Sequence, residues 1–316
     1  DHNAYARWNR IDKVKLSNQG AWLTFEVLPL KGDGYLHWQH VPSGAKDSMF
    51  AAKDLQMNET GSLMAWRRTA GFDTLRTCEL NKIDKKKWPK DTMVVYNSIK
   101  DTLRKEAQVK RFQVAESADY LAYLKEQNDK PQSSTVEAPR KCWFRKKEKP
   151  TEQVKEIKSD GTTLVLENRD YSLFRVNNTT DFLLSSQGNL AYITQEKGKR
   201  DTSTLWVLTP DALLPIKVGN QHFSIKNLQW NKEGTFLAFL YSSDTNKVKQ
   251  YDLGVYSLLK DSLITFGDST TTKSYGFKGI NDKVQPIFFD YLPYVKFTLS
   301  DRIVFQKDTL LESEKV

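Results

Sequence analysis

The amino-acid sequence predicts an all-β protein, and within that class a β-propeller. Three observations lead there: an aromatic content of 12% with 8 Trp and 13 Tyr, a recurring hairpin-like pattern, and the near absence of helical periodicity. Aromatic side chains suit the pleated, half-buried surface that strands present. A chain of 316 residues exceeds the usual domain size but lies within the range of one large all-β domain.

The recurring pattern is an apolar run, a short polar turn that often holds Gly, and then an aliphatic, a small and an aromatic residue. Its first copy reads VKLSNQGAWLTF. Each copy predicts two strands joined by a turn in which Gly or a short polar residue takes positive φ. Six copies are recognised, at residues 14–25, 55–66, 112–123, 182–192, 228–239 and 295–305.

The spacing of the copies predicts one four-stranded blade per copy. The closing aromatic residues lie 41, 57, 69, 47 and 66 positions apart; the two shortest intervals match one blade, and the longer ones require inserted loops. Strand-like runs that would supply the outer strands occur at residues 93–96, 163–166, 173–176, 205–208, 213–218, 253–257 and 262–266. A β-sandwich or a pair of irregular β-domains is the alternative architecture.

Two segments depart from this pattern. Residues 98–110 (SIKDTLRKEAQVK) are the one stretch with helical spacing of apolar residues, although a strand-rich loop is equally compatible. Residues 127–161 are rich in Lys, Glu, Pro and Ser and poor in strand formers. Since the blade pattern resumes in phase at Thr162, we expect a charged, flexible loop insertion within a blade rather than a domain linker.

Charge and cysteine content exclude few functions. Lys and Arg exceed Asp and Glu by 48 − 39 = +9, and the basic residues concentrate at 82–90 and 140–149, beside turn-like sequence. We expect solvated loops there and no nucleic-acid partner, with a binding patch as the alternative. Cys78 and Cys142 lack any zinc-type spacing, so no metal or cofactor is predicted; two free thiols are expected, and a disulfide stays open. No apolar run is long enough to span a bilayer.

Three of the copies carry a family resemblance. Residues 16–25 (LSNQGAWLTF), 184–192 (LSSQGNLAY) and 230–239 (WNKEGTFLAF) resemble the repeat S-x-D-G-x-x-Φ-A-Φ of TolB-like and peptidase propellers. The Asp of that repeat is replaced by another residue in each copy, so its turn hydrogen bond is not carried over. The replacing residues are Gln19, Gln187 and Glu233.

Two further stretches narrow the resemblance. The opening WNRI at residues 8–11 and the run TTLVLENRDY at residues 162–171 are similar to exported bacterial prolyl oligopeptidase-family, dipeptidyl peptidase-like serine peptidases. The resemblance covers essentially the whole chain. It implies the amino-terminal propeller of such an enzyme, which gates access and docks peptide substrates for a carboxy-terminal α/β-hydrolase domain. It also implies an exported protein, periplasmic or in the cell envelope.

The catalytic machinery of that family is not recognisable. Residues 267–271 (GDSTT) lack the second Gly of the nucleophile motif G-x-S-x-G. The four histidines, His2, His37, His40 and His222, have no triad context. We therefore expect no catalytic residue in this chain, and no substrate-binding residue can be assigned.

Acidic loop residues that bind a substrate amino terminus in some relatives cannot be matched to a motif. Glu116, Glu126 and Glu137 lie in or near variable loops, and surface carboxylates are mostly solvated. The resemblance implies seven or eight blades, so about six starts predict a ring truncated at Val316, with an open edge that could mediate dimerisation.

Two other functions compete with the peptidase propeller. The first is a free-standing TolB-like interaction propeller that binds a protein or an anionic glycan. The second is a sialidase-like hydrolase, because residues 17–22 faintly resemble an Asp-box turn. That turn lacks Asp, and no Arg cluster with a Tyr nucleophile is identifiable, so the hydrolase is disfavoured.

Overall fold

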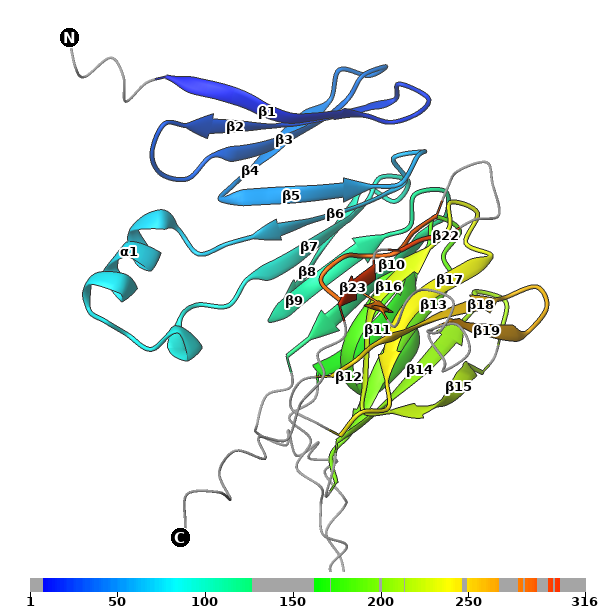
Figure 1. Cartoon of the computed structure of the whole chain (residues 1–316). Helices are drawn as coiled ribbons and strands as arrows, with labels where there is room; N and C mark the ends of the chain where they lie inside the picture. Colours follow the sequence, from blue (N-terminus) through cyan, green and yellow to red (C-terminus); the bar gives the residue numbers. More distant parts are fainter. Residues whose placement is uncertain are drawn as a thin grey trace, which may run out of the picture.

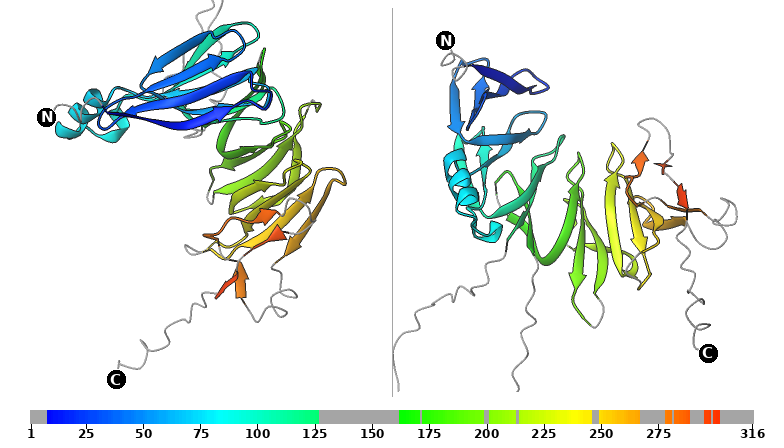
Figure 2. Two further views of the ribbon diagram at one scale, coloured as in Figure 1. Left: turned by 90° about the horizontal axis from the view of Figure 1, so that it is seen from above. Right: turned by 60° about the vertical axis from the view of Figure 1, so that its left-hand side comes forward.

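The computed structural model is an all-β propeller whose four-stranded antiparallel blades follow one another along the chain (Figure 1). The structure describes residues 8–126, 162–170, 172–198, 201–212, 214–245, 249–266, 278–280, 282–288, 295–297 and 299–301. Five blades are described in full apart from short gaps and the 127–161 segment. Figure 2 shows them arranged along an arc that stays open between the first blade and the last strands described.

Each blade places its strands in sequence order from the inside outward. Blade 1 holds β1 (Asn9–Leu16), β2 (Trp22–Pro29), β3 (Tyr35–His40) and β4 (Lys46–Phe50). Blade 2 holds β5 (Ala52–Met57), β6 (Leu63–Arg68), β7 (Thr92–Asn97) and β8 (Thr102–Ala107). Blade 5 holds β16 (Ser224–Trp230), β17 (Phe236–Ser242), β18 (Asp252–Ser257) and β19 (Ser262–Phe266).

Blades 3 and 4 share one long strand. Blade 3 holds β9 (Val109–Val114), β10 (Tyr120–Lys125), β11 (Thr162–Asn168) and the first part of β12 (Ser172–Leu184). Blade 4 uses the second part of β12 with β13 (Leu190–Glu196), β14 (Thr202–Leu208) and β15 (Ile216–His222). The register shifts near Thr179, where β12 changes partner from β11 to β13, so one uninterrupted strand serves as the outer strand of one blade and the inner strand of the next.

The last strands described are short. They pair as β20 (Lys278–Ile280) with β23 (Leu299–Asp301) and β21 (Ile287–Phe288) with β22 (Val295–Lys296). Five of the six predicted hairpins are therefore seen. The sixth, at residues 295–305, differs, because its described strands pair with β20 and β21 instead of with each other; Phe305 lies outside the described residues.

Of the two possibilities left open for residues 98–110, a helix and a strand-rich loop, the structure shows the second. β8 and the start of β9 occupy this stretch, and Gln108 between them has a φ of 62° that interrupts the extended backbone. The helices described, α1 (Phe72–Leu80) and η2 (Lys85–Lys87), form an insertion between β6 and β7 that the sequence pattern did not predict. α1 buries none of its residues, so it has no strong apolar periodicity to reveal it. No helix in the described part of the chain is long and apolar enough to cross a membrane.

The core lies between blades rather than within one. Each cluster of buried side chains joins two neighbouring blades, as where Leu36 and Trp38 of blade 1 meet Met64 and Trp66 of blade 2. The closing aromatic residues of blades 2 to 5 are central to these clusters, whereas Phe25 of blade 1 is only half-buried. Trp66, Tyr123, Tyr192 and Phe239 are all at most 2% exposed.

The inner hairpin turns explain why these sequences form blades. In blade 2 the backbone N–H of Asn58 donates to the carbonyl of Leu63, and the N–H of Leu63 donates to the Asn58 side-chain oxygen, both at 3.2 Å. Gly61 follows with φ +72°, which a residue with a Cβ adopts only under strain. Side-chain oxygens of Ser17, Ser185 and Asn231 cap the equivalent turns, so the cap comes from the Ser position of the repeat and does not need the absent Asp.

Main-chain hydrogen bonds also link these turns from blade to blade. The Asn18 N–H donates to the Glu59 carbonyl at 2.9 Å, and the Glu59 N–H donates to the Glu116 carbonyl at 2.7 Å. The series of hydrogen bonds extends to blade 4, where the Ser117 N–H donates to the carbonyl of Ser186 at 2.9 Å. The turns between first and second strands are therefore held side by side on one face of the arc.

Candidate functional site

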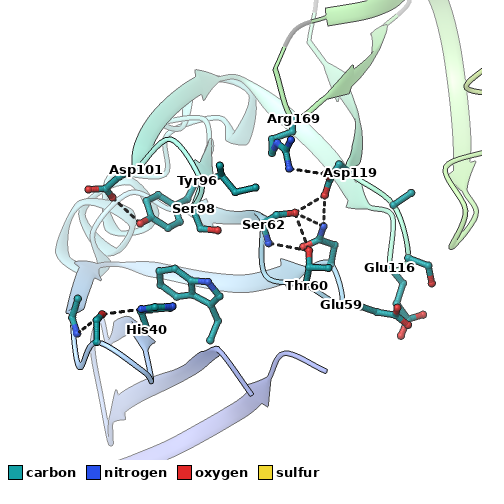
Figure 3. A pocket seen from close by; sticks show the side chains of 17 residues that line it. His40, Glu59, Thr60, Ser62, Tyr96, Ser98, Asp101, Glu116, Asp119 and Arg169 are labelled. Atoms are coloured by element: carbon teal, nitrogen blue, oxygen red, sulfur yellow. Dashed lines mark hydrogen bonds and ion pairs between the residues drawn. The ribbon is translucent and has the colours of Figure 1, made fainter. Parts of the chain in front are cut away.

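A pocket of about 720 Å³ opens on the face where these linked turns meet (Figure 3). It is lined by the turns between the first and second strands of blades 2 and 3, and by the turns between the third and fourth strands of blades 1 and 2. Trp22 of β2 and Arg169, in the turn between β11 and β12, complete the lining. Three blades thus contribute to one site.

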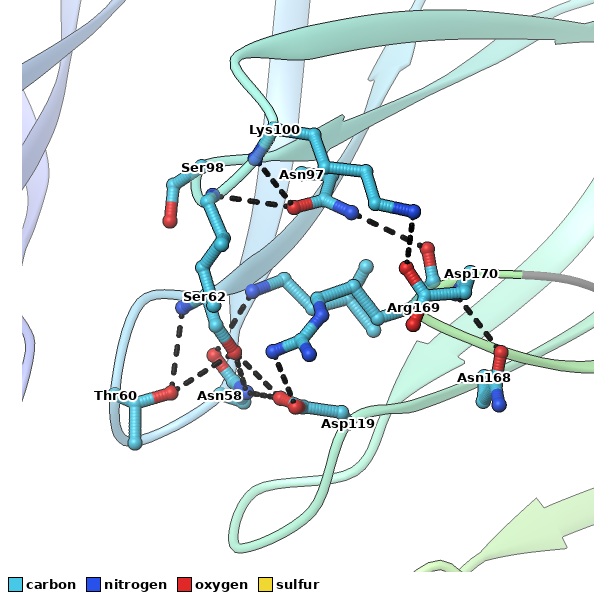
Figure 4. Close-up of polar contacts among 12 residues, drawn as sticks. Asn58, Thr60, Ser62, Asn97, Ser98, Lys100, Asp119, Asn168, Arg169 and Asp170 are labelled. Atoms are coloured by element: carbon cyan, nitrogen blue, oxygen red, sulfur yellow. Dashed lines mark hydrogen bonds and ion pairs between the residues drawn. The ribbon is translucent and has the colours of Figure 1, made fainter.

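A polar network forms the floor of the pocket (Figure 4). Asn58, which is 2% exposed, donates from Nδ2 to Ser62 Oγ at 2.8 Å and to Asp119 Oδ1 at 2.6 Å. The Ser62 hydroxyl also donates to Asp119 Oδ1, and the Thr60 hydroxyl donates to Ser62 Oγ at 2.9 Å. A carboxylate of blade 3 therefore satisfies buried donors of blade 2, which fixes the two turns against each other.

Arg169 neutralises that carboxylate from the other side. Its Nη1 donates to Asp119 Oδ2 at 2.8 Å, and its backbone N–H donates to the Asp119 carbonyl at 3.0 Å. The next residue, Asp170, pairs with Lys100 of blade 2 at 2.7 Å. Charge within the floor is consequently compensated, and we assign the floor a structural role.

Aromatic side chains form one wall. The Trp22 ring lies 4.9 Å from the His40 ring and 5.8 Å from the Tyr96 ring, measured between centroids. Trp22 also packs on Gly61, where an added Cβ would come within 2.4 Å of the indole. The Tyr96 hydroxyl donates to Asp101 Oδ1 at 2.8 Å; burial, together with this hydrogen bond, raises the pKa of Tyr96 to about 12.

The rim carries two carboxylates without a counter-charge. Glu59 and Glu116 occupy equivalent positions in neighbouring turns, and Figure 3 shows their side chains close together. Neither has an ion-pair partner in the described part of the chain. Four carboxylates and one guanidinium line the pocket, a formal charge of 1 − 4 = −3 with His40 neutral, in a chain of net charge +9. The pocket therefore favours a cationic ligand.

The three glutamates considered in the sequence analysis do not share one site. Glu116 lies at the pocket rim, whereas Glu126 pairs with Lys90 at 3.3 Å, and Glu137 lies outside the described residues. Glu59, Asp119 and Arg169 were missed. Aligning the hairpin copies would have placed Glu59 and Glu116 at the same turn position of consecutive blades, which is the signal the sequence holds.

The described histidines have separate surroundings. His37 stacks on Phe25, His40 contacts the Ser43 hydroxyl at 2.8 Å, and His222 contacts the Ser243 hydroxyl at 3.2 Å. In the described part of the chain no carboxylate extends either serine contact into a triad. His2 and residues 267–271 lie outside the described residues.

The basic segments and the cysteines that the sequence analysis named lie partly inside and partly outside the described residues. The side chains of Lys82, Lys85 and Lys87 are exposed on the insertion that carries α1 and η2. Cys78 is a free thiol, whereas Cys142, the basic stretch at 140–149 and the insertion at 127–161 lie outside the described residues. No cluster of His, Cys, Asp and Glu suited to a metal ion occurs among the residues the structure places.

Comparisons with known proteins do not assign the chain to a family. No family model and no curated protein matches the chain. Among solved structures, the β-propeller domain of the Trilobed protease from Pyrococcus furiosus is 10% identical over 94% of this chain and 79% of its own, with a TM-score of 0.46. Acylaminoacyl peptidase from Pyrococcus horikoshii is 9% identical, with a TM-score of 0.46; 95% of this chain is matched, spanning 44% of that enzyme.

TolB from Acinetobacter baumannii is a third similar structure, 6% identical over 81% of this chain and 54% of its own, with a TM-score of 0.33. At such identities and scores these likenesses carry no argument about function. The propeller itself rests on the blade-by-blade strand order described above.

Proposed function

We propose that this chain is the non-catalytic propeller portion of a prolyl oligopeptidase-like serine peptidase, and that the pocket docks peptide substrates through their cationic amino terminus. The observation that carries the docking role is the pair of uncompensated carboxylates, Glu59 and Glu116, at the rim of an acidic pocket. The sequence resemblance supports the peptidase context, including gating of access, an exported location and a separate α/β-hydrolase domain.

The chemistry of the rim suits an ammonium group. Two carboxylates side by side repel each other, and an ammonium group placed between them removes that repulsion and donates strong, charge-assisted hydrogen bonds to both. Asp119 does not compete for the ligand, because Asn58, Ser62 and Arg169 already occupy its oxygens. Binding then requires little rearrangement of the floor.

Peptide titration followed by calorimetry tests this function. A short peptide with a free amino terminus should bind, and its amino-acetylated counterpart should bind at least about 10-fold more weakly, the equivalent of one charge-assisted hydrogen bond. Glu59→Gln and Glu116→Gln should each weaken binding of the free peptide. Glu233→Gln, an exposed glutamate in the corresponding turn of blade 5, is the matched control. Equal affinity for both peptides would refute the docking role.

A free-standing TolB-like interaction propeller is the second candidate. The observation favouring it is the insertion of blade 2, where Lys82, Lys85 and Lys87 are exposed and could meet an anionic protein or glycan. Sequencing the natural reading frame distinguishes the two functions. A downstream domain with G-x-S-x-G supports the peptidase portion, and its absence supports the free-standing module.

A further inference from the structure

The insertion of blade 2 projects from the body of the propeller. It joins β6 to β7 and carries α1 and η2, and Figure 1 shows α1 extending away from the blades. α1 has nine residues and buries none of them. A helix this short gains little stability by itself, and packing against the core adds little here. The insertion therefore contributes surface to the molecule and not core.

Hydrogen bonds nevertheless hold the insertion in one shape. The backbone N–H of Phe72, the first residue of α1, donates to Asp33 Oδ2 of blade 1 at 2.6 Å. Beyond the end of α1, the Ile83 N–H donates to the Cys78 carbonyl at 2.9 Å, and the Trp88 indole N–H donates to the Ile83 carbonyl at 2.9 Å. The backbone between α1 and η2 is thus fixed at the tip of the insertion.

This tip combines exposed apolar side chains with unpaired lysines. Leu80 is 70% exposed and Ile83 is 37% exposed, so neither belongs to the core. Next to them in the chain are Lys82, Lys85 and Lys87, which are exposed and have no ion-pair partner among the residues that the structure describes. Two chemistries that water alone does not require together occur on one short segment.

Charge and apolar exposure together favour one class of partner. Residues 72–90 hold six basic and three acidic residues, a formal charge of 6 − 3 = +3, so the partner is anionic. A polyanionic glycan or an acidic protein segment would engage the lysines but would leave Leu80 in water. A bilayer with anionic lipids suits both, because its headgroups attract lysine and the boundary of its acyl chains accepts aliphatic side chains.

We propose that the tip of the blade 2 insertion binds the surface of a membrane that contains anionic lipids. Lys82, Lys85 and Lys87 lie at the headgroups, and Leu80 and Ile83 enter the boundary between headgroups and acyl chains. This binding is independent of peptide docking in the pocket. For the free-standing propeller, it puts a lipid surface in place of the anionic protein or glycan considered above.

The position of the tip keeps the pocket accessible during such binding. β6 begins next to Ser62, which lines the pocket, and ends at Arg68, where the insertion follows. β7 then returns to the pocket, next to Ser98. Six strand residues span about 20 Å, so the insertion leaves blade 2 at the end opposite the pocket. A chain bound through the tip thus presents its pocket away from the membrane.

Vesicle flotation with the 316-residue chain tests the proposal. The chain should bind vesicles of equal parts phosphatidylcholine and phosphatidylglycerol, and should not bind vesicles of phosphatidylcholine alone. The triple variant Lys82→Gln, Lys85→Gln and Lys87→Gln should bind the anionic vesicles at least about 10-fold more weakly, because each lysine near an anionic surface contributes to the attraction. Circular dichroism confirms that this variant and those below fold.

A matched triple variant controls for net charge. Lys217→Gln, Lys232→Gln and Lys260→Gln remove the same charge from exposed lysines of blades 4 and 5, and this protein should bind the anionic vesicles as the unchanged chain does. Equal loss of binding in the two triple variants would overturn the proposal, because overall charge and not the tip would then hold the chain. Absence of binding to the anionic vesicles would overturn it too.

Leu80→Ser distinguishes a lipid surface from other anionic partners. It should weaken binding to the anionic vesicles at least about 3-fold, because less apolar surface is buried, and should leave binding to heparin, a soluble polyanion, unchanged. Leu259→Ser, at a turn residue of blade 5 that is 79% exposed, is the control and should change neither. Vesicle binding that does not respond to Leu80→Ser would overturn the proposal and would indicate an anionic glycan or protein as the partner.

Discussion

Blades 2 and 5 are built alike, yet only blade 2 contributes to the pocket. Their inner turns read N-E-T-G-S at residues 58–62 and N-K-E-G-T at residues 231–235, and in both the Asn side chain bonds the hydroxyl residue four positions later. Their outer turns read YNSIKD at residues 96–101 and YSLLKD at residues 256–261, with the Tyr hydroxyl bonded to the final Asp in both. Shared features of this kind build the blade and do not specify a ligand.

The difference between the two blades lies in charge and in what the next blade supplies. Glu59 of blade 2 stands where blade 5 has Lys232, and Asp119 of blade 3 reaches across to Asn58. Tyr96 therefore lines the pocket because it belongs to the scaffold, whereas Glu59 and Glu116 give the pocket its charge. Paired substitutions in the two blades can test that division.

The largest effect is expected from the closing aromatic residues. Trp66→Ala and Phe239→Ala should each lower the free energy of unfolding by about 3–5 kcal/mol, because each leaves a cavity between two blades. Urea unfolding followed by circular dichroism measures both losses. Losses below about 1 kcal/mol in either blade would contradict the assignment of the core to the blade interfaces.

Removing the side chain that caps the inner turn should lower stability by different amounts in blades 2 and 5. Asn231→Ala removes a self-contained cap and should cost about 1 kcal/mol, whereas Asn58→Ala also removes one of the donors to Asp119 and should cost about 2–3 kcal/mol. The same unfolding measurement applies, with Asn18→Ala as an exposed control in the turn of blade 1. Equal losses at the two caps would show that the bond to Asp119 adds nothing.

The hydroxyl groups of the outer turns should matter equally. Tyr96→Phe and Tyr256→Phe each remove one hydrogen bond to Asp, at 2.8 Å and 2.7 Å, and should each cost about 1 kcal/mol. If Tyr96 is scaffold, the first substitution should also leave peptide affinity within about 2-fold. A larger loss of affinity with Tyr96→Phe would make that hydroxyl part of the binding site.

The smallest effect concerns alkaline pH. Because the folded protein raises the pKa of Tyr96 from 10.0 to about 12, the stability this group contributes is fully present below pH 10 and is lost as pH rises to about 12. Asp101→Asn should lower that pKa only partway, since burial is the larger cause. Absorbance titration of tyrosinate measures the shift, with the Tyr96→Phe protein identifying which step belongs to Tyr96.

Much of the fold could be predicted because short stretches of sequence determine the strands and turns of each blade. A polar residue, a Gly with positive φ and an alternating apolar run are enough to specify the inner hairpin, as at residues 182–192. The helix α1 was not predictable in this way, because it buries nothing and leaves no strong periodicity. The pocket was missed for a different reason: Glu59, Asp119 and Arg169 are distant in sequence and line one pocket only when blades 2 and 3 pack side by side.

One set of hydrogen bonds between the inner turns, from Asn18 to Glu59 and from Glu59 to Glu116, is made by peptide groups and not by side chains. Substituting Glu59 or Glu116 therefore leaves these bonds between blades intact, since every non-proline residue supplies the same N–H and carbonyl. Evolution can exchange the charges on this face without weakening the assembly beneath it. A propeller joined in this manner can change its ligand while keeping its stability.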